Sequence, residues 1–404
     1  MRLGPRVVVL DDDPTGTQAA AGVTVLLDPL APPPPGDGPY YVLTNTRAMA
    51  EPEAVALLGE IRARHGEAEY VLRGDSTLRG HVFAESDAFG AREGVLLFAP
   101  AFPAGGRTTV GGVHYVDVDG RRLVAADTEF AADPVFGYTA RTMVEWVREV
   151  GGREAVSVPL ARLGALADVL GEAAPATVVV PDAESDDDLR TISAGLDLAR
   201  RGGARVVLRC AAPLAAIRAD RLATGLLTGD MSAPGPALIV CGSHTEASGR
   251  QLAEVAARTG APVRTLSAEA AQTGPGAEGE RLAALLDRDL DHGGIAILAT
   301  ERVRRAEHGS LQHGARVMRA LCGAVAGVAG RLGAVIAKGG ITSAQVARDG
   351  LGAQSAEVLG PLLPGVAVWR ARSGAGTAIP YAVVPGNIGG PRTLVDVAHA
   401  FGLV

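Results

Sequence analysis

Three adjacent carboxylates, Asp11, Asp12 and Asp13, directly follow the apolar run Val7 to Leu10. The β-branched residues of that run predict a short buried strand, so the acids lie at the carboxyl end of a strand. In an open α/β sheet that edge faces the ligand crevice. Adjacent carboxylates repel one another unless a cation, hydrogen-bond donors or water neutralise them. The stretch therefore indicates a site for a metal ion or a hydroxyl proton, or else an acidic turn in which Asp13 caps the next helix.

A second dense polar loop, residues 73–81, follows a predicted strand at 70–72. It holds two arginines, one acid and two hydroxyl side chains: Arg73, Asp75, Ser76, Thr77 and Arg79. Because a guanidinium group grips a carboxylate through two parallel hydrogen bonds, the loop suits a carboxylate or polyol ligand. Ion pairing of either arginine with the acid of the same loop is the alternative. A further cation, Arg107, follows the predicted strand 95–98 in a loop that contains glycines.

Three loops in the second half of the sequence combine glycines with polar side chains just before a predicted helix. The first contains Gly242 and Ser243, the second reads Lys338-Gly339-Gly340-Ile341-Thr342-Ser343, and the third contains Gly386 and Asn387. Free backbone N–H groups at a helix N-terminus bind phosphate, so a nucleotide is the favoured ligand. No GxxxxGK(S/T) motif occurs, which excludes an ordinary P-loop fold. The GxGxxG spelled by residues 274–279 follows no predicted strand, so we discard it as a dinucleotide fingerprint.

Composition narrows the class of protein. The 404 residues carry a formal net charge of −7 without a long basic run, so nucleic acid is not an expected partner. Three scattered cysteines, Cys210, Cys241 and Cys322, lack the spacing of a zinc site or the even count of a secreted disulfide framework. No stretch approaches the roughly 20 uninterrupted apolar residues of a membrane span. The early first strand leaves no room for a signal peptide, so we expect a soluble cytoplasmic protein.

The length favours two domains, and the hydrophobic content of 47% supplies a core for each. The turn-rich segment 233–236 breaks the pattern just before a predicted strand at 237–241. We therefore expect an N-terminal domain at 1–233 and a C-terminal domain at 237–404.

Strands and helices alternate along much of the sequence. Strands predicted at 155–159, 177–180 and 204–208 alternate with helices at 160–172 and 186–201, the latter capped by Ser185. That order favours parallel strands joined by crossover helices. A β-hairpin over 113–124 and helices over 311–332 and 393–400 are also predicted. The expected fold class is α/β: two domains, each a largely parallel β-sheet flanked by helices, with an interdomain cleft.

The polar loops match the motifs of a known family, in order and over nearly the whole chain. Asp12-Asp13-Pro14-Thr15-Gly16 corresponds to Asp-Asp-x-Thr-Gly, and residues 75–80 spell Asp-Ser-Thr-Leu-Arg-Gly. Gly242-Ser243, Gly339-Gly340-x-Thr342-Ser343 and Gly386-Asn387-x-Gly389 are similar to three ATP-contacting stretches. Each motif is short, but together they are specific. The sequence resembles the four-carbon acid sugar kinases.

The resemblance implies an N-terminal acid-sugar domain and a C-terminal ATP domain, which phosphorylate threonate, erythronate or a 3-oxo-tetronate with ATP and Mg²⁺. It implies that Asp12 or Asp13 accepts the hydroxyl proton or holds Mg²⁺, and that Arg79 acts with Arg73 and Arg107 on the substrate carboxylate and on developing charge. Asp75, Ser76 and Thr77 would complete the substrate site. The cofactor residues would be Ser243, Lys338, Gly339, Gly340, Ile341, Thr342, Ser343, Gly386 and Asn387. The metal ligands stay unassigned.

Two positions depart from the family pattern. Members commonly have a lysine just before the last loop, where this sequence has Val384-Pro385, and an acidic residue after the glycine pair, where it has Ile341. Lys338 could supply the missing charge. The alternatives left open are a non-catalytic sensor that binds an acid sugar or nucleotide, and a dinucleotide-dependent dehydrogenase. The expected partners are an acid sugar and ATP, without nucleic acid or membrane. Whether the protein forms a homodimer is left open.

Overall fold

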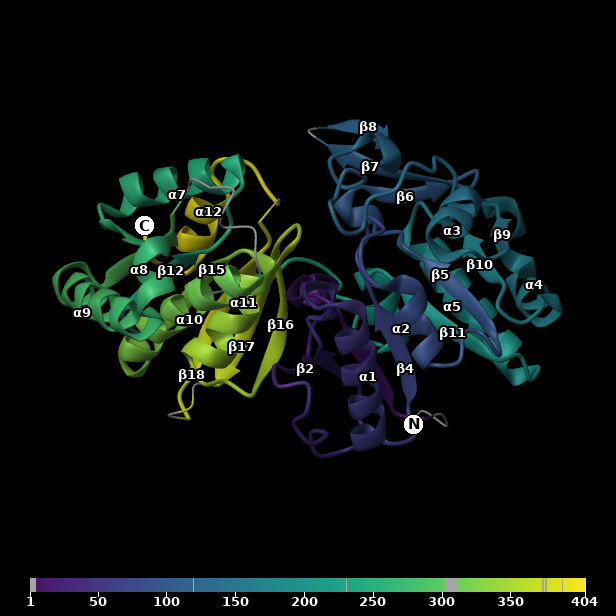
Figure 1. The fold of residues 1–404 in the computed structure, drawn as a ribbon, viewed down its shortest axis with the longest axis horizontal. Helices are drawn as coiled ribbons and strands as arrows, with labels where there is room; N and C mark the ends of the chain where they lie inside the picture. Colours follow the sequence, from purple (N-terminus) through teal and green to yellow (C-terminus); the bar gives the residue numbers. More distant parts are fainter. Residues whose placement is uncertain are drawn as a thin grey trace. The chain divides into compact units, whose positions relative to one another are not determined.

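The computed structural model describes residues 5–118, 120–229, 231–301, 311–372, 374, 376–386 and 388–404. The chain divides into two compact units, whose elements are labelled in Figure 1. Unit 1 comprises Met1–Val23 and Pro29–Ala223, and unit 2 comprises Thr24–Asp28 and Thr224–Val404. Both units combine strands and helices, so the α/β class predicted from the sequence is confirmed.

Unit 1 contains a parallel sheet of short apolar strands. Its order is β3 (Tyr40–Leu43), β1 (Val7–Asp11), β4 (Glu69–Arg73), β11 (Val206–Cys210), β5 (Val95–Ala99), β10 (Val178–Pro181) and β9 (Ala155–Val158). Asp11 pairs in register with Arg73, and Arg73 pairs with Cys210. The carboxyl ends of β1, β4 and β11 therefore meet at one edge of the sheet.

Unit 1 also contains α-helices, which lie between its strands in the sequence. They are α1 (Glu51–His65), α2 (Val82–Ala88), α3 (Met143–Gly151), α4 (Leu166–Glu172), α5 (Asp186–Arg201) and α6 (Ala212–Arg218). The prediction that Ser185 caps a helix is confirmed, since its side chain and that of Asp188 form a capping box at the start of α5. The core includes Trp146 of α3, whose ring stacks on that of Phe98 in β5.

A separate antiparallel sheet in unit 1 consists of β6 (Arg107–Val110), β7 (Val113–Val118) and β8 (Arg121–Val124). The predicted hairpin at 113–124 is confirmed by β7 and β8. The prediction that Arg107 belongs to a loop is wrong, because residues 107–110 form a strand paired with β7. Thr108, Thr109 and Val110 are β-branched, and this local preference prevails over the glycines that precede them.

Unit 2 contains a mixed sheet. Its order is β13 (Val263–Leu266), β14 (Ile295–Thr300), β12 (Ala237–Cys241), β15 (Ala334–Lys338), β18 (Ala378–Val384), β17 (Val366–Arg372), β16 (Ser355–Leu363) and β2 (Val23–Leu26). The strands from β13 to β18 in this order pair in parallel, whereas β17 is antiparallel to both β18 and β16. This antiparallel meander was not predicted from the sequence.

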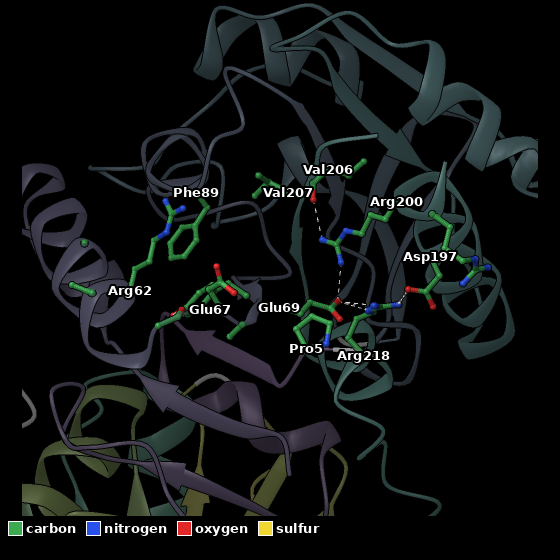
Figure 2. A pocket seen from close by; sticks show the side chains of 16 residues that line it. Pro5, Arg62, Glu67, Glu69, Phe89, Asp197, Arg200, Val206, Val207 and Arg218 are labelled. Atoms are coloured by element: carbon green, nitrogen blue, oxygen red, sulfur yellow. Dashed lines mark hydrogen bonds and ion pairs between the residues drawn. The ribbon is translucent and has the colours of Figure 1, made fainter. Parts of the chain in front are cut away.

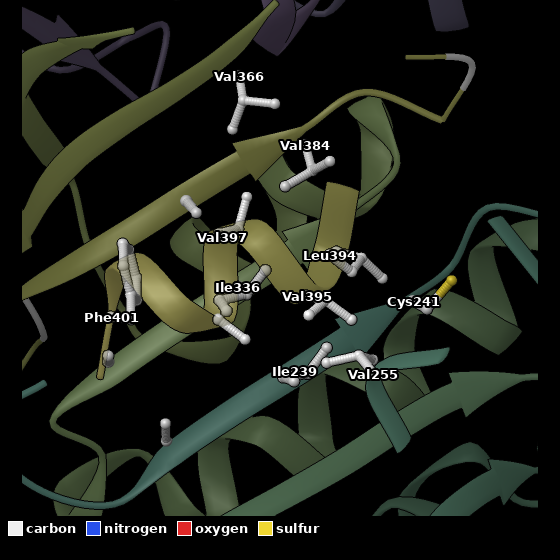
Figure 3. Close-up of a cluster of buried hydrophobic side chains, with 14 of the residues drawn as sticks. Ile239, Cys241, Val255, Ile336, Val366, Val384, Leu394, Val395, Val397 and Phe401 are labelled. Atoms are coloured by element: carbon white, nitrogen blue, oxygen red, sulfur yellow. The ribbon is translucent and has the colours of Figure 1, made fainter. Parts of the chain in front are cut away.

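The helices of unit 2 are α7 (Glu246–Thr259), α8 (Ala268–Thr273), α9 (Pro275–Gly293), α10 (Leu311–Val328), α11 (Gly340–Gln345) and α12 (Thr393–Ala400). Figure 3 shows α12 against the strands, with Leu394 and Val395 near Ile239 and Ile336. These buried side chains fix the C-terminal helix onto β12 and β15, the strands that precede two of the glycine-rich loops.

Several element boundaries differ from prediction. The helix predicted at 160–172 is divided into a 3-10 segment, Leu160–Ala165, and α4. The helix predicted at 311–332 ends at Val328. The strand predicted at 204–208 extends to Cys210, which carries Arg209 to the carboxyl edge of the sheet. Within the described ranges, no helix combines the length and apolarity needed to cross a bilayer.

Candidate functional site

The carboxyl edge of the unit 1 sheet carries a buried cluster of acids and guanidinium groups. Arg73 ends β4, and its Nη1 donates to Asp11 Oδ1 at 2.8 Å, to Asp12 Oδ1 at 3.4 Å and to the Asp13 backbone oxygen at 3.1 Å. Only 2% of Arg73 is exposed. Its guanidinium is thus committed to the acidic triplet, and it was predicted instead as a ligand of the substrate carboxylate.

The three aspartates of this triplet have different pKa shifts. Burial raises the pKa of Asp11 to about 7 against the opposing effect of Arg73. Burial also raises the pKa of Asp12, although Arg47, Arg209 and Arg73 counteract it. Burial alone would raise the pKa of Asp13, but Arg47 and Arg73 outweigh it and lower the value.

Asp13 is held by its own turn. Its Oδ1 accepts from the Thr15 backbone N–H at 2.7 Å and from the Thr15 hydroxyl, which caps the 3-10 helix Pro14–Ala19. The reading of Asp13 as a cap is therefore confirmed. Its Oδ2 pairs with Arg47, so both oxygens have partners. The oxygens of Asp12 make longer contacts, 3.4 Å to Arg73 and 3.3 Å to Arg209.

Arg47 joins the two acidic loops, and the sequence-based selection missed it. Its Nη2 pairs with Asp13 Oδ2, and its Nη1 lies 3.2 Å from Asp75 Oδ1. Arg47 follows β3, the neighbour of β1 in the sheet. Its position just after a predicted strand was the signal that could have identified it, because carboxyl ends of parallel strands meet at one edge.

Arg209 was also missed. Its Nη2 donates to Asp12 Oδ2 at 3.3 Å, and its Nη1 donates to Glu85, a buried residue of α2. Arg209 is 1% exposed. It directly follows the strand predicted at 204–208, so the signal that could have identified Arg47 could have identified Arg209 as well.

The loop at 74–81 forms a compact network around Asp75. Asp75 Oδ2 accepts from Arg79 Nε at 2.8 Å and from the Thr77 hydroxyl. Burial alone would raise the pKa of Asp75, but Arg47 and Arg79 hold it far below its usual value. Arg79 also lies over the Phe130 ring, 5.0 Å from its centroid. The sequence analysis considered an ion pair between an arginine and the acid of this loop. That pair is present between Arg79 and Asp75, and Asp75 also pairs with Arg47.

His114 ties this loop to the antiparallel sheet. Its Nε2 lies 2.8 Å from the Ser76 backbone oxygen, and its Nδ1 lies 2.9 Å from the Thr109 hydroxyl. Burial lowers the pKa of His114 to about 4, so the ring is neutral near pH 7. Ser76 therefore contributes its backbone oxygen to the structure, and its side chain is largely buried.

Within the described part of the chain, Arg107 is one of the site arginines with a donor that makes no hydrogen bond, together with Arg47, Arg73 and Arg209. Arg107 Nη1 donates to the Gly105 carbonyl, while the buried Nε has no hydrogen-bond partner among the described residues. Burial lowers its pKa, and Asp75 and Asp117 oppose that effect. Arg79 acts on the same guanidinium electrostatically, so these two arginines are neighbours.

Guanidinium groups balance the charges of the unit 1 cluster. Its acids are Asp11, Asp12, Asp13, Asp75 and Glu85, and its cations are Arg47, Arg73, Arg79, Arg107 and Arg209. Across the described part of the chain, no group of three or more histidine, cysteine or acidic side chains is arranged to hold a metal ion. The acids therefore do not fit a divalent cation, because each already faces at least one arginine.

In unit 2 the three glycine-rich loops meet around Ser243. A Cβ on Gly242 would lie 2.0 Å from Thr342 Oγ1, and a Cβ on Gly386 would lie 2.7 Å from Ser243 Oγ. Gly339, at a φ of +118°, lies close to the Ser243 backbone nitrogen. These contacts bring together the three stretches that the sequence assigned to one nucleotide. They require glycine because the loops approach one another at backbone distance.

Hydrogen bonds around Ser243 connect α7 to the last loop. The Ser248 hydroxyl donates to Ser243 Oγ at 2.9 Å and to the Gly386 backbone oxygen at 3.0 Å. The Thr245 side chain caps α7 by accepting from the Ser248 backbone N–H. The Gln251 side-chain amide reaches three carbonyls of the same loop, those of Ile388, Gly389 and Gly390.

Lys338 lies beneath the last loop. Its ammonium donates to the Pro385 carbonyl at 2.6 Å and to the Ile388 carbonyl at 3.1 Å, and the residue is fully buried. Burial lowers the pKa of Lys338 to about 8. The structure therefore gives this lysine a loop-holding role, which differs from the free phosphate-facing cation inferred from the sequence.

The residues of the 339–343 stretch differ in exposure, since some are buried in internal contacts and one is exposed to solvent. Gly340 is the first residue of α11, and Ile341 beside it is 46% exposed. Thr342 is buried against Gly242. The Ser343 hydroxyl donates to the Ala337 and Gly339 carbonyls, so its hydrogen bonds are internal. Asn387, predicted as a cofactor residue, lies outside the described residues.

A cavity of about 1390 Å³ lies at the opposite, amino edge of the unit 1 sheet (Figure 2). It is lined by Glu69 and Val206, the first residues of β4 and β11, together with Arg200 and Arg218. Glu69 Oε1 accepts from Arg200 at 2.9 Å and from Arg218 at 2.6 Å. Arg200 and Arg218 are thus already paired with an acid of the cavity wall.

The fold and the two loop clusters define an α/β protein with an acid- and arginine-rich site in one unit and glycine-rich loops in the other. A family described as a sugar-binding N-terminal domain matches residues 7–218, and one described as a nucleotide-binding C-terminal domain matches residues 238–394. The chain belongs to the four-carbon acid sugar kinase family.

Two curated relatives are similar over part of the sequence. The D-threonate kinase of Cupriavidus necator is 32% identical over 233 residues, 54% of this chain and 52% of that protein. The D-threonate kinase of Bordetella bronchiseptica is 33% identical over 233 residues, 55% of this chain and 52% of that protein. The chain spans about half the length of the curated relatives it matches.

Solved structures share the fold over nearly the full length. A Haemophilus influenzae protein has a TM-score of 0.67 at 17% identity, covering 98% of this chain and 100% of that one. A Salmonella typhimurium LT2 protein has a TM-score of 0.71 at 18% identity, covering 97% and 98%. At these identities the likeness shows the fold alone.

Proposed function

We propose that this protein is an ATP-dependent kinase that phosphorylates a hydroxyl group of a four-carbon acid sugar of the threonate, erythronate or 3-oxo-tetronate type. The observation that carries the proposal is the edge cluster of unit 1, where Asp12, whose pKa burial raises, lies among arginines in the same cluster as Arg79 and Arg107. Such a cluster suits a ligand that has both a hydroxyl and a carboxylate. The relationship to two D-threonate kinases supports the same substrate class.

Asp12 is the general base in this proposal. Burial raises the pKa of Asp12, whereas that of Asp13 is lowered, so Asp12 is the better proton acceptor of these two. Asp11, whose pKa burial raises to about 7, has no exposed surface and is paired with Arg73, so it does not face a ligand. Asp13 has both oxygens engaged by Thr15 and Arg47. Beside Asp12, Gly80 has no side chain, and a Cβ there would lie 3.2 Å from Oδ2, so backbone borders that oxygen on one side while Arg209 Nη2 lies 3.3 Å from it.

The reaction is an in-line transfer. The hydroxyl oxygen of the acid sugar forms a bond to the γ-phosphorus of ATP while the bond to the bridging oxygen of the leaving ADP breaks, and Asp12 accepts the hydroxyl proton. Positioning supplies much of the rate in such a reaction. Arg107 and Arg79 would bind the substrate carboxylate, because Arg73 and Arg209 are almost fully buried and each pairs with a buried acid through Nη1.

The nucleotide phosphates would be bound by the loops around Ser243 in unit 2. Backbone N–H groups in glycine-rich turns, together with hydroxyl groups, are suitable phosphate ligands. The family resemblance implies Mg²⁺ alongside ATP. The acidic cluster of unit 1 does not fit that ion, because arginines neutralise its carboxylates, so we assign it no Mg²⁺ ligand and derive no step through the ion.

The test is incubation of the protein with ATP, Mg²⁺ and a panel of four-carbon acids, with ADP release measured by a coupled assay and the product identified by phosphorus NMR. We expect ADP release and a phosphorylated acid for at least one member of the panel. Thermal stabilisation by an acid without ADP release would indicate the sensor alternative, and reduction of NAD would indicate a dehydrogenase.

The Asp12→Asn variant tests the assigned base. Loss of a general base lowers kcat by about 10²–10⁴-fold, and ATP binding should be unchanged because Asp12 lies in the sugar-binding unit. A variant that turns over at the wild-type rate would exclude Asp12 from this role.

A further inference from the structure

The arginine at the end of β11 contacts the predicted base, although neither the motifs nor the family comparison assigns it a role. Arg209 Nη2 lies 3.3 Å from Asp12 Oδ2, and Arg209 Nη1 pairs with Glu85 of α2. We propose that Arg209 is a positioning residue, which holds Asp12 in place and keeps it ionised for the transfer. This inference rests on the proposed function, because it needs Asp12 to accept the proton.

The space for this guanidinium is provided by two glycines of the loop at 74–81. A Cβ on Gly74 would lie 2.5 Å from Arg209 Nε, a distance that no side chain could occupy without displacing the arginine. A Cβ on Gly80, at a φ of +114°, would lie 3.4 Å from Arg209 Nη2 and 3.2 Å from Asp12 Oδ2. The loop backbone therefore packs directly against the pair formed by Arg209 and Asp12.

Arg209 is the cation most nearly dedicated to Asp12. Arg73 shares its guanidinium among all three acids of the triplet. Arg47 pairs directly with Asp13 and Asp75. Arg209 has two acidic partners, Asp12 and Glu85, and all three residues are at most 2% exposed. In such a buried setting the attraction between opposite charges is screened little by water.

The charges that act on Asp12 belong to Arg73 of β4, Arg209 of β11, Glu85 of α2, Arg47 after β3 and the adjacent Asp11. Burial raises the pKa of Asp12. The positive charges of Arg47, Arg209 and Arg73 lower that pKa, whereas the negative charge of Glu85 raises it. Removing Arg209 therefore shifts the pKa of Asp12 upward, so the acid limb of the pH profile moves to higher pH. Removing the charge of Glu85 alone has the opposite sign and moves the limb to lower pH.

A purely structural role would have different consequences. The ion pair between Arg209 and Glu85 also links β11 to α2, and a buried charge left without its partner destabilises a protein strongly. A structural arginine would thus alter the melting temperature and leave the pH dependence of the active fraction unchanged. The double variant Arg209→Met with Glu85→Gln removes both charges together, so it avoids an unpaired buried charge.

The experiment compares wild type, Glu85→Gln and the double variant in the kinase assay with the best acid of the panel. We expect the acid limb of kcat/KM to move up in the double variant, because Arg209 acts on Asp12 more strongly than Glu85 does, and to move down in Glu85→Gln. The KM for ATP should stay within twofold. A folded double variant with the wild-type limb and wild-type kcat would overturn the inference.

A second readout does not depend on turnover. The protein is labelled with carbon-13 in its aspartate carboxyl groups, the Asp12 signal is assigned with Asp12→Asn, and its pKa is followed by NMR. The pKa should be higher in the double variant than in wild type, and equal values would overturn the inference. If the pKa shifts as expected while wild type phosphorylates no acid of the panel, the proposed function fails and the electrostatic coupling stands.

Discussion

At the residue scale, the three consecutive aspartates show how position alone separates acids of the same type. Asp11 is fully buried, Asp12 is bordered by long contacts to two arginines, and Asp13 is locked by Thr15 and Arg47. Their different pKa shifts follow from these surroundings. Asp13, although it belongs to the Asp-Asp-x-Thr-Gly motif, is therefore the acid of the three best suited to a structural role.

Replacing Asp13 with asparagine should destabilise the protein more than it alters the chemistry. The asparagine side chain would keep an acceptor for Thr15 but lose the ion pair with Arg47, and breaking a largely buried pair typically costs about 3–5 kcal/mol. The measurement is urea unfolding together with kcat at a temperature where the variant is folded. If the folded variant has lost all turnover while Asp12→Asn retains it, the assignment of the base must be exchanged.

Arg107→Met should weaken the binding of the acid sugar. Hydrogen bonds to charged groups contribute about 1.5–3 kcal/mol, so the KM for the acid should rise roughly 10- to 100-fold while the KM for ATP is unchanged. The matched control is Arg122→Met, an exposed arginine of β8 paired with Glu184, which should behave as wild type. An equal rise in KM for both variants would contradict a carboxylate-binding role for Arg107.

The buried Asp11 should make stability depend on pH. Its pKa is raised from 3.8 to about 7 in the folded protein, so the folded state binds more protons than the unfolded state between these values. This contribution to the free energy of unfolding is present below about pH 4 and is lost as the pH rises to 7. Asp11→Asn lacks that titration.

The measurement is urea unfolding of both proteins at several pH values from 4 to 8. The stability of wild type relative to Asp11→Asn should fall over this range. A constant difference would show that Asp11 titrates at the same pH in both states, as it would if Arg73 fully offset its burial.

The sequence could identify the acids of the site better than their partners. Asp12, Asp75 and Arg79 belong to short contiguous motifs next to predicted strands, and the structure brings their loops together through Arg47. Arg209 comes from a strand distant in sequence, and its role depends on the order of β4 and β11 in the sheet. That order is a tertiary property, so no local pattern reveals it.

At the element scale, the last loop of unit 2 is held from two sides by buried polar side chains. Lys338 at the end of β15 reaches the carbonyls of Pro385 and Ile388, and Gln251 of α7 reaches those of Ile388 to Gly390. Fixing a loop before ligand binding reduces the entropy lost on binding. We therefore expect Lys338 to act on nucleotide affinity through the loop.

Lys338→Met should raise the KM for ATP roughly tenfold or more, because the loop carbonyls lose charge-assisted hydrogen bonds of about 1.5–3 kcal/mol. The KM for the acid sugar should be unaffected. Arg264→Met is the control, since it removes a cation and its pair with Asp289 at a distance in sequence from the loops of the same unit. Unchanged ATP affinity in a folded Lys338→Met protein would contradict the role of the loop.

Elements were predictable where one local signal decided them. The bounds of α5 and α12 match prediction because apolar periodicity defines them within the segment, and in α5 the capping box of Ser185 also marks the start. The meander β16 to β18 escaped prediction, since its direction depends on pairing between strands.

At the scale of the whole molecule, the two units should respond to different ligands. The sugar-binding family description covers residues 7–218, and the nucleotide-binding description covers 238–394. Hydrogen exchange reports this division directly, because an amide that becomes protected on binding identifies the segment that a ligand orders. The prediction can be examined with each substrate alone, without any turnover.

D-threonate or the best acid of the panel should slow exchange at residues 74–81, where the backbone packs on Arg209 and His114 contacts Ser76. A non-hydrolysable ATP analogue should slow exchange at 242–245, at 339–343 and at Gly386, in the loops that meet at Ser243. The variants supply the controls: Arg107→Met should remove the first protection and Lys338→Met should reduce the second. Protection of residues 74–81 by the nucleotide analogue alone, with none around Ser243, would refute the assignment of the two sites.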